Sequence, residues 1–180
     1  MPVRAPKDLS QALKQGKIDP IYFLFGPEAY LRDRAARAIT DEALRDTLLC
    51  EFNETSFSLL NDDVRSAIAA AEQLPMMSSR RVVRIKDFAK LREDDEEFLL
   101  RYVERPVESS VVIFLSSDID KRKKLAKTLM QGAAFEFQPL KNNELSMWAK
   151  SHLKSLNNSA SASYAASLIR KLIASETDAV

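Results

Sequence analysis

The fold is constrained most by a series of short apolar runs, each separated from the next by a segment long enough for a helix. Residues 21–25 (IYFLF) and 111–115 (VVIFL) contain only aliphatic and aromatic side chains. Runs of this kind, without polar alternation, are typical of parallel strands that are buried on both faces. Three further segments have the length and composition of strands: 51–57, 81–85 and 134–137.

The segments between these runs have the apolar spacing of helices. Within residues 28–49, Leu31, Ala35 and Ile39 recur near the helical period. The other helical segments are 62–74, 94–104 and 121–131. Because strands and helices alternate along the chain, the sequence predicts an α/β domain in which a parallel sheet is flanked by helices.

The alternation stops near Leu140, and two helical segments follow, 142–156 and 163–174. We therefore expect two domains, an α/β domain over residues 1–140 and a small helical domain over residues 141–180. Two helices bury little apolar surface by themselves. The second domain is accordingly expected to be truncated.

Charge and composition exclude several classes of protein. The chain has 27 basic and 26 acidic residues, so a nucleic-acid or membrane partner must be argued from a local patch. No apolar run approaches the roughly 18 residues of a membrane span, and the N-terminus lacks the apolar core of a signal peptide. Cys50 and His152 are the sole cysteine and histidine. We expect a cytoplasmic protein with no disulfide, no metal and no cofactor.

A single glycine follows the first apolar run, in the layout of a phosphate-binding loop. The pattern G-x-x-x-x-G-K-[ST], counted from Gly26, places the second glycine at Leu31, the lysine at Arg32 and the hydroxyl at Asp33. A leucine side chain obstructs the close approach of backbone to phosphate, and an aspartate repels phosphate. The sequence predicts a degenerate loop that does not bind ATP.

Residues 118–129 (DIDKRKKLAKTL) contain the strongest basic patch of the chain. Two interpretations stay open: contact with DNA phosphates or an acidic neighbouring subunit, or a solvated helix face. The patch has none of the interleaved aromatic residues that form a stacking platform for single strands. Its basic residues are Lys121, Arg122, Lys123, Lys124 and Lys127.

Three stretches taken together resemble a known family. They are PIYFLFGPEAYLRDRAARAI, LPMMSSRRVVRIKDF and SSVVIFLSSDIDKRKKLAKTLMQGAAFEFQPLKNNELSMWAKSHL. In this order they resemble the delta subunit of the bacterial DNA polymerase III clamp loader, from about residue 8 to residue 173. The resemblance implies an AAA+ module that does not hydrolyse ATP, a small helical lid domain, and a C-terminal collar that is absent from this chain.

The resemblance also implies a clamp-binding site in the stretch 73–81 (QLPMMSSRR). Carried over by position, Met76 and Met77 form an apolar plug for a pocket on the sliding clamp, with Leu74 beside them and Arg80 supporting the contact. Methionine suits such a role because its side chain is flexible and polarizable. The alternative is that both methionines are core residues at a helix-to-strand turn.

The predicted function is that of a non-catalytic clamp-loader subunit, which binds the sliding clamp and helps to open it for loading onto primed DNA. The implied partners are the sliding clamp (beta), the sister subunits delta prime and tau or gamma, which bind through the missing collar, and DNA in the assembled complex. No membrane partner is expected, and the implied location is the bacterial cytoplasm. Two alternatives remain open at this point, a divergent active AAA+ ATPase and a DNA-binding module that uses residues 121–127.

Overall fold

The structure, a computed structural model, describes residues 4–139 of the 180-residue chain. The chain divides after Gln138, and the elements given below belong to the first unit. The predicted helices of residues 141–180 lie outside the described residues, so the small helical lid domain stays a prediction.

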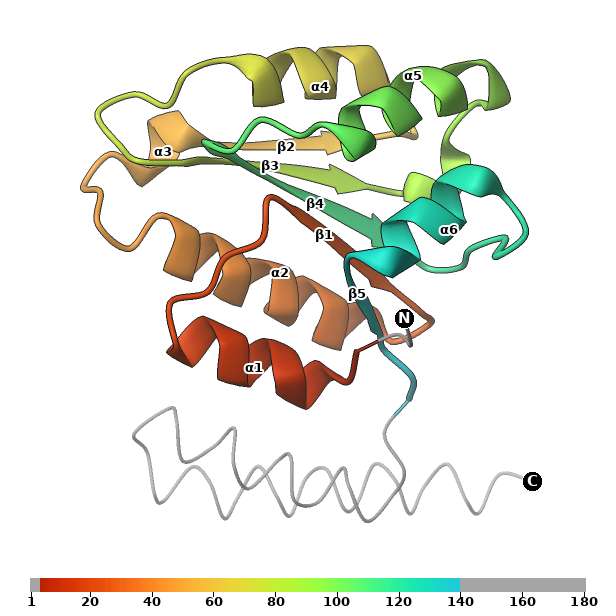
Figure 1. The fold of residues 1–180 in the computed structure, drawn as a ribbon, viewed down its shortest axis with the longest axis horizontal. Coiled ribbons are helices and arrows are strands. Elements are labelled where there is room, and N and C mark those ends of the chain that lie inside the picture. Colours follow the sequence, from red (N-terminus) through yellow and green to blue (C-terminus); the bar gives the residue numbers. More distant parts are fainter. Residues whose placement is uncertain (1–3, 140–180) are drawn as a thin grey trace. The chain divides into compact units, whose positions relative to one another are not determined.

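Five parallel strands form one sheet, in the order β2-β3-β4-β1-β5. In its register, Tyr22 of β1 lies between Ile113 of β4 and Ala133 of β5. The predicted parallel sheet with flanking helices is confirmed (Figure 1). The elements are α1 (Pro6–Lys14), β1 (Ile21–Phe25), α2 (Ala29–Ala43), α3 (Cys50–Asn53), β2 (Glu54–Ser58), α4 (Val64–Glu72), β3 (Arg81–Lys86), the 3-10 turn η1 (Phe88–Lys90), α5 (Glu93–Glu104), β4 (Ser110–Ser116), α6 (Lys124–Gln131) and β5 (Ala133–Glu136).

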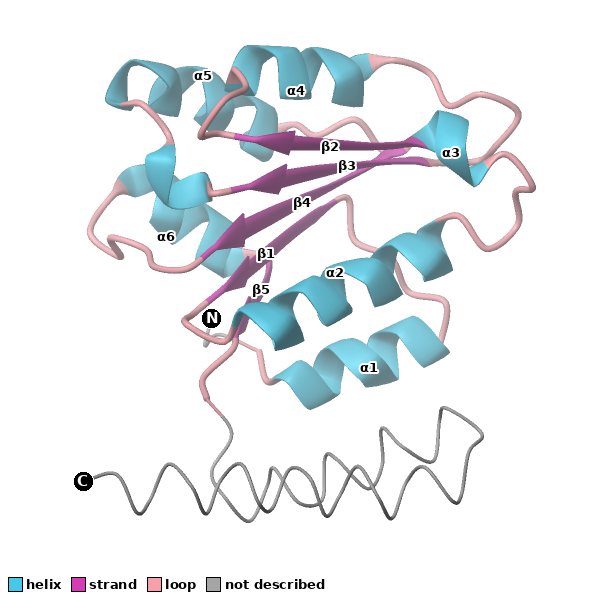
Figure 2. Cartoon of the chain, turned by 180° about the vertical axis from the view of Figure 1, so that it is seen from behind, coloured by secondary structure: helices cyan, strands magenta, loops and turns pink. Residues whose placement is uncertain are grey.

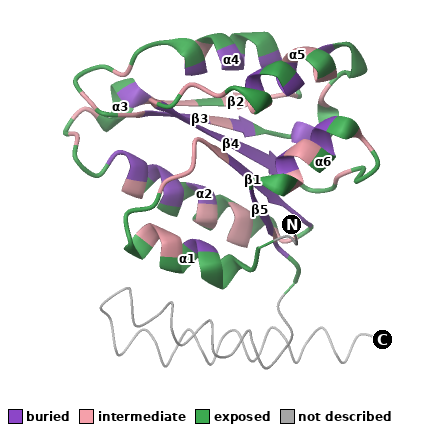
Figure 3. Ribbon diagram, in the orientation of Figure 1, coloured by how far each residue is buried: buried purple, intermediate pink, exposed green. Residues whose placement is uncertain are grey.

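The central strands are buried on both faces, because successive side chains point to opposite sides of the sheet. Tyr22 and Leu24 pack with α1 and α2, whereas Phe23 and Phe25 pack with α4, α5 and α6. Figure 2 shows α1 and α2 on the near face, and Figure 3 shows the buried strands between the layers. Each fully buried side chain of this size contributes about 1.5–3 kcal/mol. Strands that are apolar throughout are therefore stable only between two helical layers.

Three predicted boundaries differ from the structure by three residues or more. Helix α2 ends at Ala43, and residues 44–46 form a turn, whereas the sequence predicted a helix as far as residue 49. Residues 50–53 form the short helix α3, so β2 begins at Glu54 rather than at residue 51. Helix α6 begins at Lys124 rather than at residue 121, because Asp120 accepts hydrogen bonds from the backbone of Arg122 (3.0 Å) and Lys123 (3.2 Å). A side-chain turn of this kind competes with the first turn of a helix.

Candidate functional site

The connection between β1 and α2 is only three residues long, Gly26 to Glu28, because α2 begins at Ala29. The three positions that were aligned with the phosphate-loop pattern, Leu31, Arg32 and Asp33, accordingly lie inside the helix and not in a loop. The helical segment predicted from residue 28 already included these positions, and the degenerate loop that does not bind ATP stays a prediction. A phosphate cradle needs several successive backbone amides that face a ligand, and this connection contains three residues.

Gly26 allows its own backbone to lie close to the backbone of Phe137. Its φ is +117°, and a Cβ there would press on the carbonyl oxygen of Phe137 and lie 2.9 Å from the carbonyl carbon. The amides nearby already have protein partners: Gly26 donates to the Ser116 carbonyl (3.1 Å) and Glu28 to the Phe137 carbonyl (3.2 Å). Phe137 donates in turn to the carbonyl of Phe25 (2.7 Å). The glycine therefore lets the segment after β5 lie directly against the end of β1.

Arg32 fills the crevice at the carboxyl ends of β1 and β4. Its Nη1 donates to the carbonyl oxygens of Gly26 and of Ser116, the second at 2.8 Å. Burial lowers the pKa of this guanidinium from its ordinary value. Helix α2 follows β1 on one face of the sheet and α6 follows β4 on the other (Figure 1). Open α/β sheets bind ligands at such a point, and here an arginine side chain occupies it.

The loop between α4 and β3, residues 73–80, is called the methionine loop below. Three of its apolar side chains, which we call the apolar tip, are exposed: Leu74 (84%), Met76 (53%) and Met77 (85%). The methionines are therefore not core residues, and the alternative that placed them in the core at this turn is wrong. Exposed apolar patches are typical of interaction sites, which makes the apolar tip a candidate site.

Polar side chains tie the methionine loop to the domain. At its base, Nη1 of Arg81 donates to the Oε1 atom of Gln73 (3.0 Å). Near its end, the Ser78 hydroxyl donates to the carbonyl of Arg80 (2.9 Å). In its middle, the side chain of Asn53 pairs with the backbone of Met76. Sequence reasoning missed Asn53, because it was assigned to a strand and the contact spans 23 residues.

The side chain of Arg80 is the only charged one in the methionine loop. It is half-buried and forms no ion pair within residues 4–139. Two further exposed apolar residues precede the neighbouring strand β2, namely Leu48 and Phe52. Phe52 directly precedes Asn53 in α3, so the apolar tip has an exposed aromatic residue close to it.

The basic patch is largely paired with acidic side chains of the same domain. Lys121 lies 3.6 Å from Glu136, Arg122 lies 2.9 Å from Asp120, and Lys123 contacts Glu96 and Glu93. Lys124 and Lys127 are exposed and form no ion pair with the part of the chain that the structure describes. The charge that is free for a phosphate backbone is therefore smaller than the sequence predicts.

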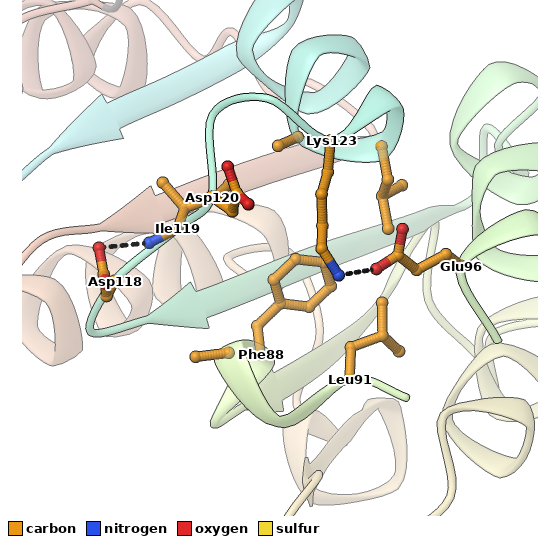
Figure 4. A pocket seen from close by; sticks show the side chains of 10 residues that line it. Phe88, Leu91, Glu96, Asp118, Ile119, Asp120 and Lys123 are labelled. Carbon is orange, nitrogen blue, oxygen red and sulfur yellow. Dashed lines mark hydrogen bonds and ion pairs between the residues drawn. The ribbon is translucent and has the colours of Figure 1, made fainter. Parts of the chain in front are cut away.

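Lys123 and Glu96 also meet across a pocket of about 190 Å³ between η1, α5 and α6 (Figure 4). Asp118 and Asp120 line the same pocket, together with the apolar side chains of Phe88 and Leu91 among others. Because acidic groups outnumber the single lysine there, the pocket does not favour an anionic ligand.

No helix in residues 4–139 is both long and apolar enough to cross a membrane.

Comparisons with known proteins agree with one another. The structure is similar to that of the Bacillus subtilis DNA clamp loader delta protein, with a TM-score of 0.71 and 29% identity over 83% of this chain and 47% of that one. It shares its fold alone with a Thermotoga maritima DNA polymerase III gamma subunit-related protein (TM-score 0.56, 12% identity, 79% and 49% covered) and with the Thermotoga maritima RuvB Holliday junction branch migration motor (0.54, 18%, 84% and 50%). The fold is thus AAA+-like.

The sequence comparisons identify the family. The chain is 32% identical over 140 residues to the Bacillus subtilis DNA polymerase III subunit delta, covering 70% of this chain and 39% of that protein. It therefore spans less than half the length of the curated relative. The profile of the family "DNA polymerase III, delta subunit" matches residues 22–138, which is more than half of the chain. The chain belongs to the DNA polymerase III delta subunit family.

Proposed function

We propose that this chain is the part of a clamp-loader delta subunit that binds the sliding clamp, and that it does so through the apolar tip. The observation that carries the proposal is the exposure of Leu74, Met76 and Met77 on a loop whose polar groups hold it to the domain. An ordered, exposed apolar loop is suited to fill a pocket on a partner protein.

The same binding would help to open the clamp. A subunit shifts a closed ring towards an open one if it binds the open form more tightly, and it needs no chemistry of its own to do so. Burying the two methionines in a pocket contributes about 1.5–3 kcal/mol each, from which the cost of association is subtracted. The positive charge of Arg80, which has no acidic partner among residues 4–139, is available to the rim of such a contact.

We further propose that the chain neither binds nor hydrolyses ATP. Three observations support this: the connection of three residues after β1, the guanidinium of Arg32 in the strand crevice, and the contact of Gly26 with Phe137. Hydrolysis would then belong to sister subunits such as tau or gamma. Assembly with them and with delta prime is proposed to use residues that this chain does not span, and the complex as a whole to act on DNA in the bacterial cytoplasm.

The test is calorimetric titration of this chain with the sliding clamp of its own organism, comparing wild type with the double variant Met76→Ala/Met77→Ala. The double variant is expected to bind at least tenfold more weakly, a loss of about 1.4 kcal/mol or more. Leu60→Ala is a matched control, because Leu60 is exposed (61%) but follows the carboxyl end of β2, whereas the methionine loop precedes the amino end of the neighbouring parallel strand β3.

Each result bears directly on the proposal. Equal weakening by Leu60→Ala and by the double variant would assign the effect to general apolarity and contradict a specific plug. Absence of binding by folded wild-type protein would contradict clamp binding altogether. Nucleotide binding that requires magnesium, at micromolar concentration, would instead favour an active ATPase.

A further inference from the structure

Asn53, the last residue of α3, is fully buried although its side chain is polar. Its Nδ2 donates to the carbonyl oxygens of Leu49 (3.0 Å) and Met76 (2.8 Å), and its Oδ1 accepts from the amide of Met76 (2.7 Å). Both donors of the side-chain amide and its oxygen are thus engaged. A fully satisfied buried amide fixes the groups that it contacts, because any other arrangement leaves polar atoms unpaired.

The pairing with Met76 imitates a strand neighbour, since one side chain satisfies both the N–H and the C=O of the same residue. The methionine loop has little else to hold it. Within residues 4–139, no backbone-to-backbone hydrogen bond joins residues 74–80 to the rest of the chain. Of the other hydrogen bonds in the described part of the chain, only those between Arg81 and Gln73 at the base and between Ser78 and Arg80 hold the loop.

The backbone next to this contact is in an unfavourable conformation. Met77 has a φ of +48°, in the left-handed region that side chains other than glycine rarely adopt. Such a conformation persists only where its surroundings hold it. The bonds from Asn53 end at Met76, one residue before Met77, so they act at the point where the chain turns and exposes the apolar tip.

We propose that Asn53 is a positioning residue for the partner-binding loop: it fixes the backbone of Met76, so that the apolar tip is ordered and exposed before the partner arrives. The identity of that partner as the sliding clamp rests on the proposed function. A loop that is already ordered loses less conformational entropy on binding. Asn53 therefore raises affinity without touching the partner, since its own side chain is buried.

The first test is a double-mutant cycle with the sliding clamp. Asn53→Ala is expected to weaken clamp binding about tenfold, and to have little further effect in the Met76→Ala/Met77→Ala background, because it acts through that tip. Asn61→Ala is the matched control, since Asn61 is exposed and lies in the turn before α4. Unchanged affinity for Asn53→Ala, or an equal loss in both backgrounds, would overturn the proposal.

The second test needs no partner and separates the two proposals. Hydrogen exchange of the Met76 amide should be slow in the wild type and fast in Asn53→Ala, while the amide of Val83 in β3 keeps its protection. Retained protection at Met76 would overturn the positioning role even if the clamp binds. If Val83 also loses protection, the smaller change Asn53→Ser replaces Asn53→Ala, with the same expected and contrary results. Loss at Met76 alone supports the positioning role even if the clamp does not bind.

Discussion

Replacing Gly26 with alanine tests whether this glycine is needed for packing of the domain rather than for a phosphate. The added Cβ would press on the Phe137 carbonyl group, at a φ of +117° that alanine disfavours. The strained φ costs about 1–2 kcal/mol. Displacing Phe137 weakens its two backbone hydrogen bonds, to Phe25 and from Glu28, at about 1 kcal/mol each. We therefore expect Gly26→Ala to lower the free energy of unfolding by about 3–4 kcal/mol.

Gly16→Ala is the control for the φ contribution alone. Gly16 also has a positive φ, +69°, but the nearest atom to its added Cβ is the Oε1 of Glu42 at 3.9 Å, an ordinary contact. Its cost is expected to be about 1 kcal/mol. In urea denaturation with an m-value of about 2 kcal/mol/M, the midpoint falls by about 1.5–2 M for Gly26→Ala and by about 0.5 M for Gly16→Ala. Equal shifts for the two variants would refute the reasoning.

Three further predictions follow from the same contacts. Arg32→Met leaves the carbonyl groups of Gly26 and Ser116 without this donor, so it should lower the free energy of unfolding, measured by denaturation, by about 1–3 kcal/mol. It should not create nucleotide binding in a titration with a fluorescent nucleotide, and a gain of binding would show that the arginine alone blocks the site. The side-chain hydrogen bond from Arg122 lowers the pKa of Asp120 from 3.8 to about 2. The contribution of this pair to stability is therefore complete above pH 3.8 and is lost as the pH falls towards 2. In Arg122→Ala the Asp120 pKa, followed by carboxyl NMR titration, should rise towards 3.8, and an unchanged value would contradict the assignment. Within the described residues, Lys124 and Lys127 alone are unpaired in the basic patch. If this chain binds duplex DNA, the logarithm of the binding constant should therefore fall with the logarithm of the salt concentration with a slope no steeper than about −2, measured by titration at several salt concentrations. A steeper slope would mean that the paired residues also reach phosphate.

Much of the fold could be predicted from local pattern. The strands β1 and β4 are apolar at every or nearly every position, and only a sheet covered on both faces buries such segments. The ends of elements were harder to predict, because local side-chain bonds decide them. The carboxylate of Asp120 delays the start of α6 to Lys124 by binding the amide of Arg122, and periodicity carries no sign of that bond.

The candidate site divides in the same way. The sequence, through its resemblance to the delta subunit family, pointed to Met76 and Met77, and the family is confirmed by the comparisons. Whether the two methionines are exposed or buried could not be predicted, because apolar residues in a turn after an apolar helix can lie either in the core or at the surface. Their exposure was decided by the tertiary structure, in which the methionine loop is tied down by polar groups instead of by its apolar ones.

The sequence by itself determined the alternation of strands and helices, the departure of Leu31, Arg32 and Asp33 from the phosphate-loop pattern, and the family. Only the tertiary structure decided what occupies the strand crevice and what holds the methionine loop. Arg32 and Ser116 are 84 residues apart along the chain, and Asn53 and Met76 are 23 apart. The physical reason is that such contacts depend on distances in space between groups that no local pattern relates, and folding of the whole sheet brings them together.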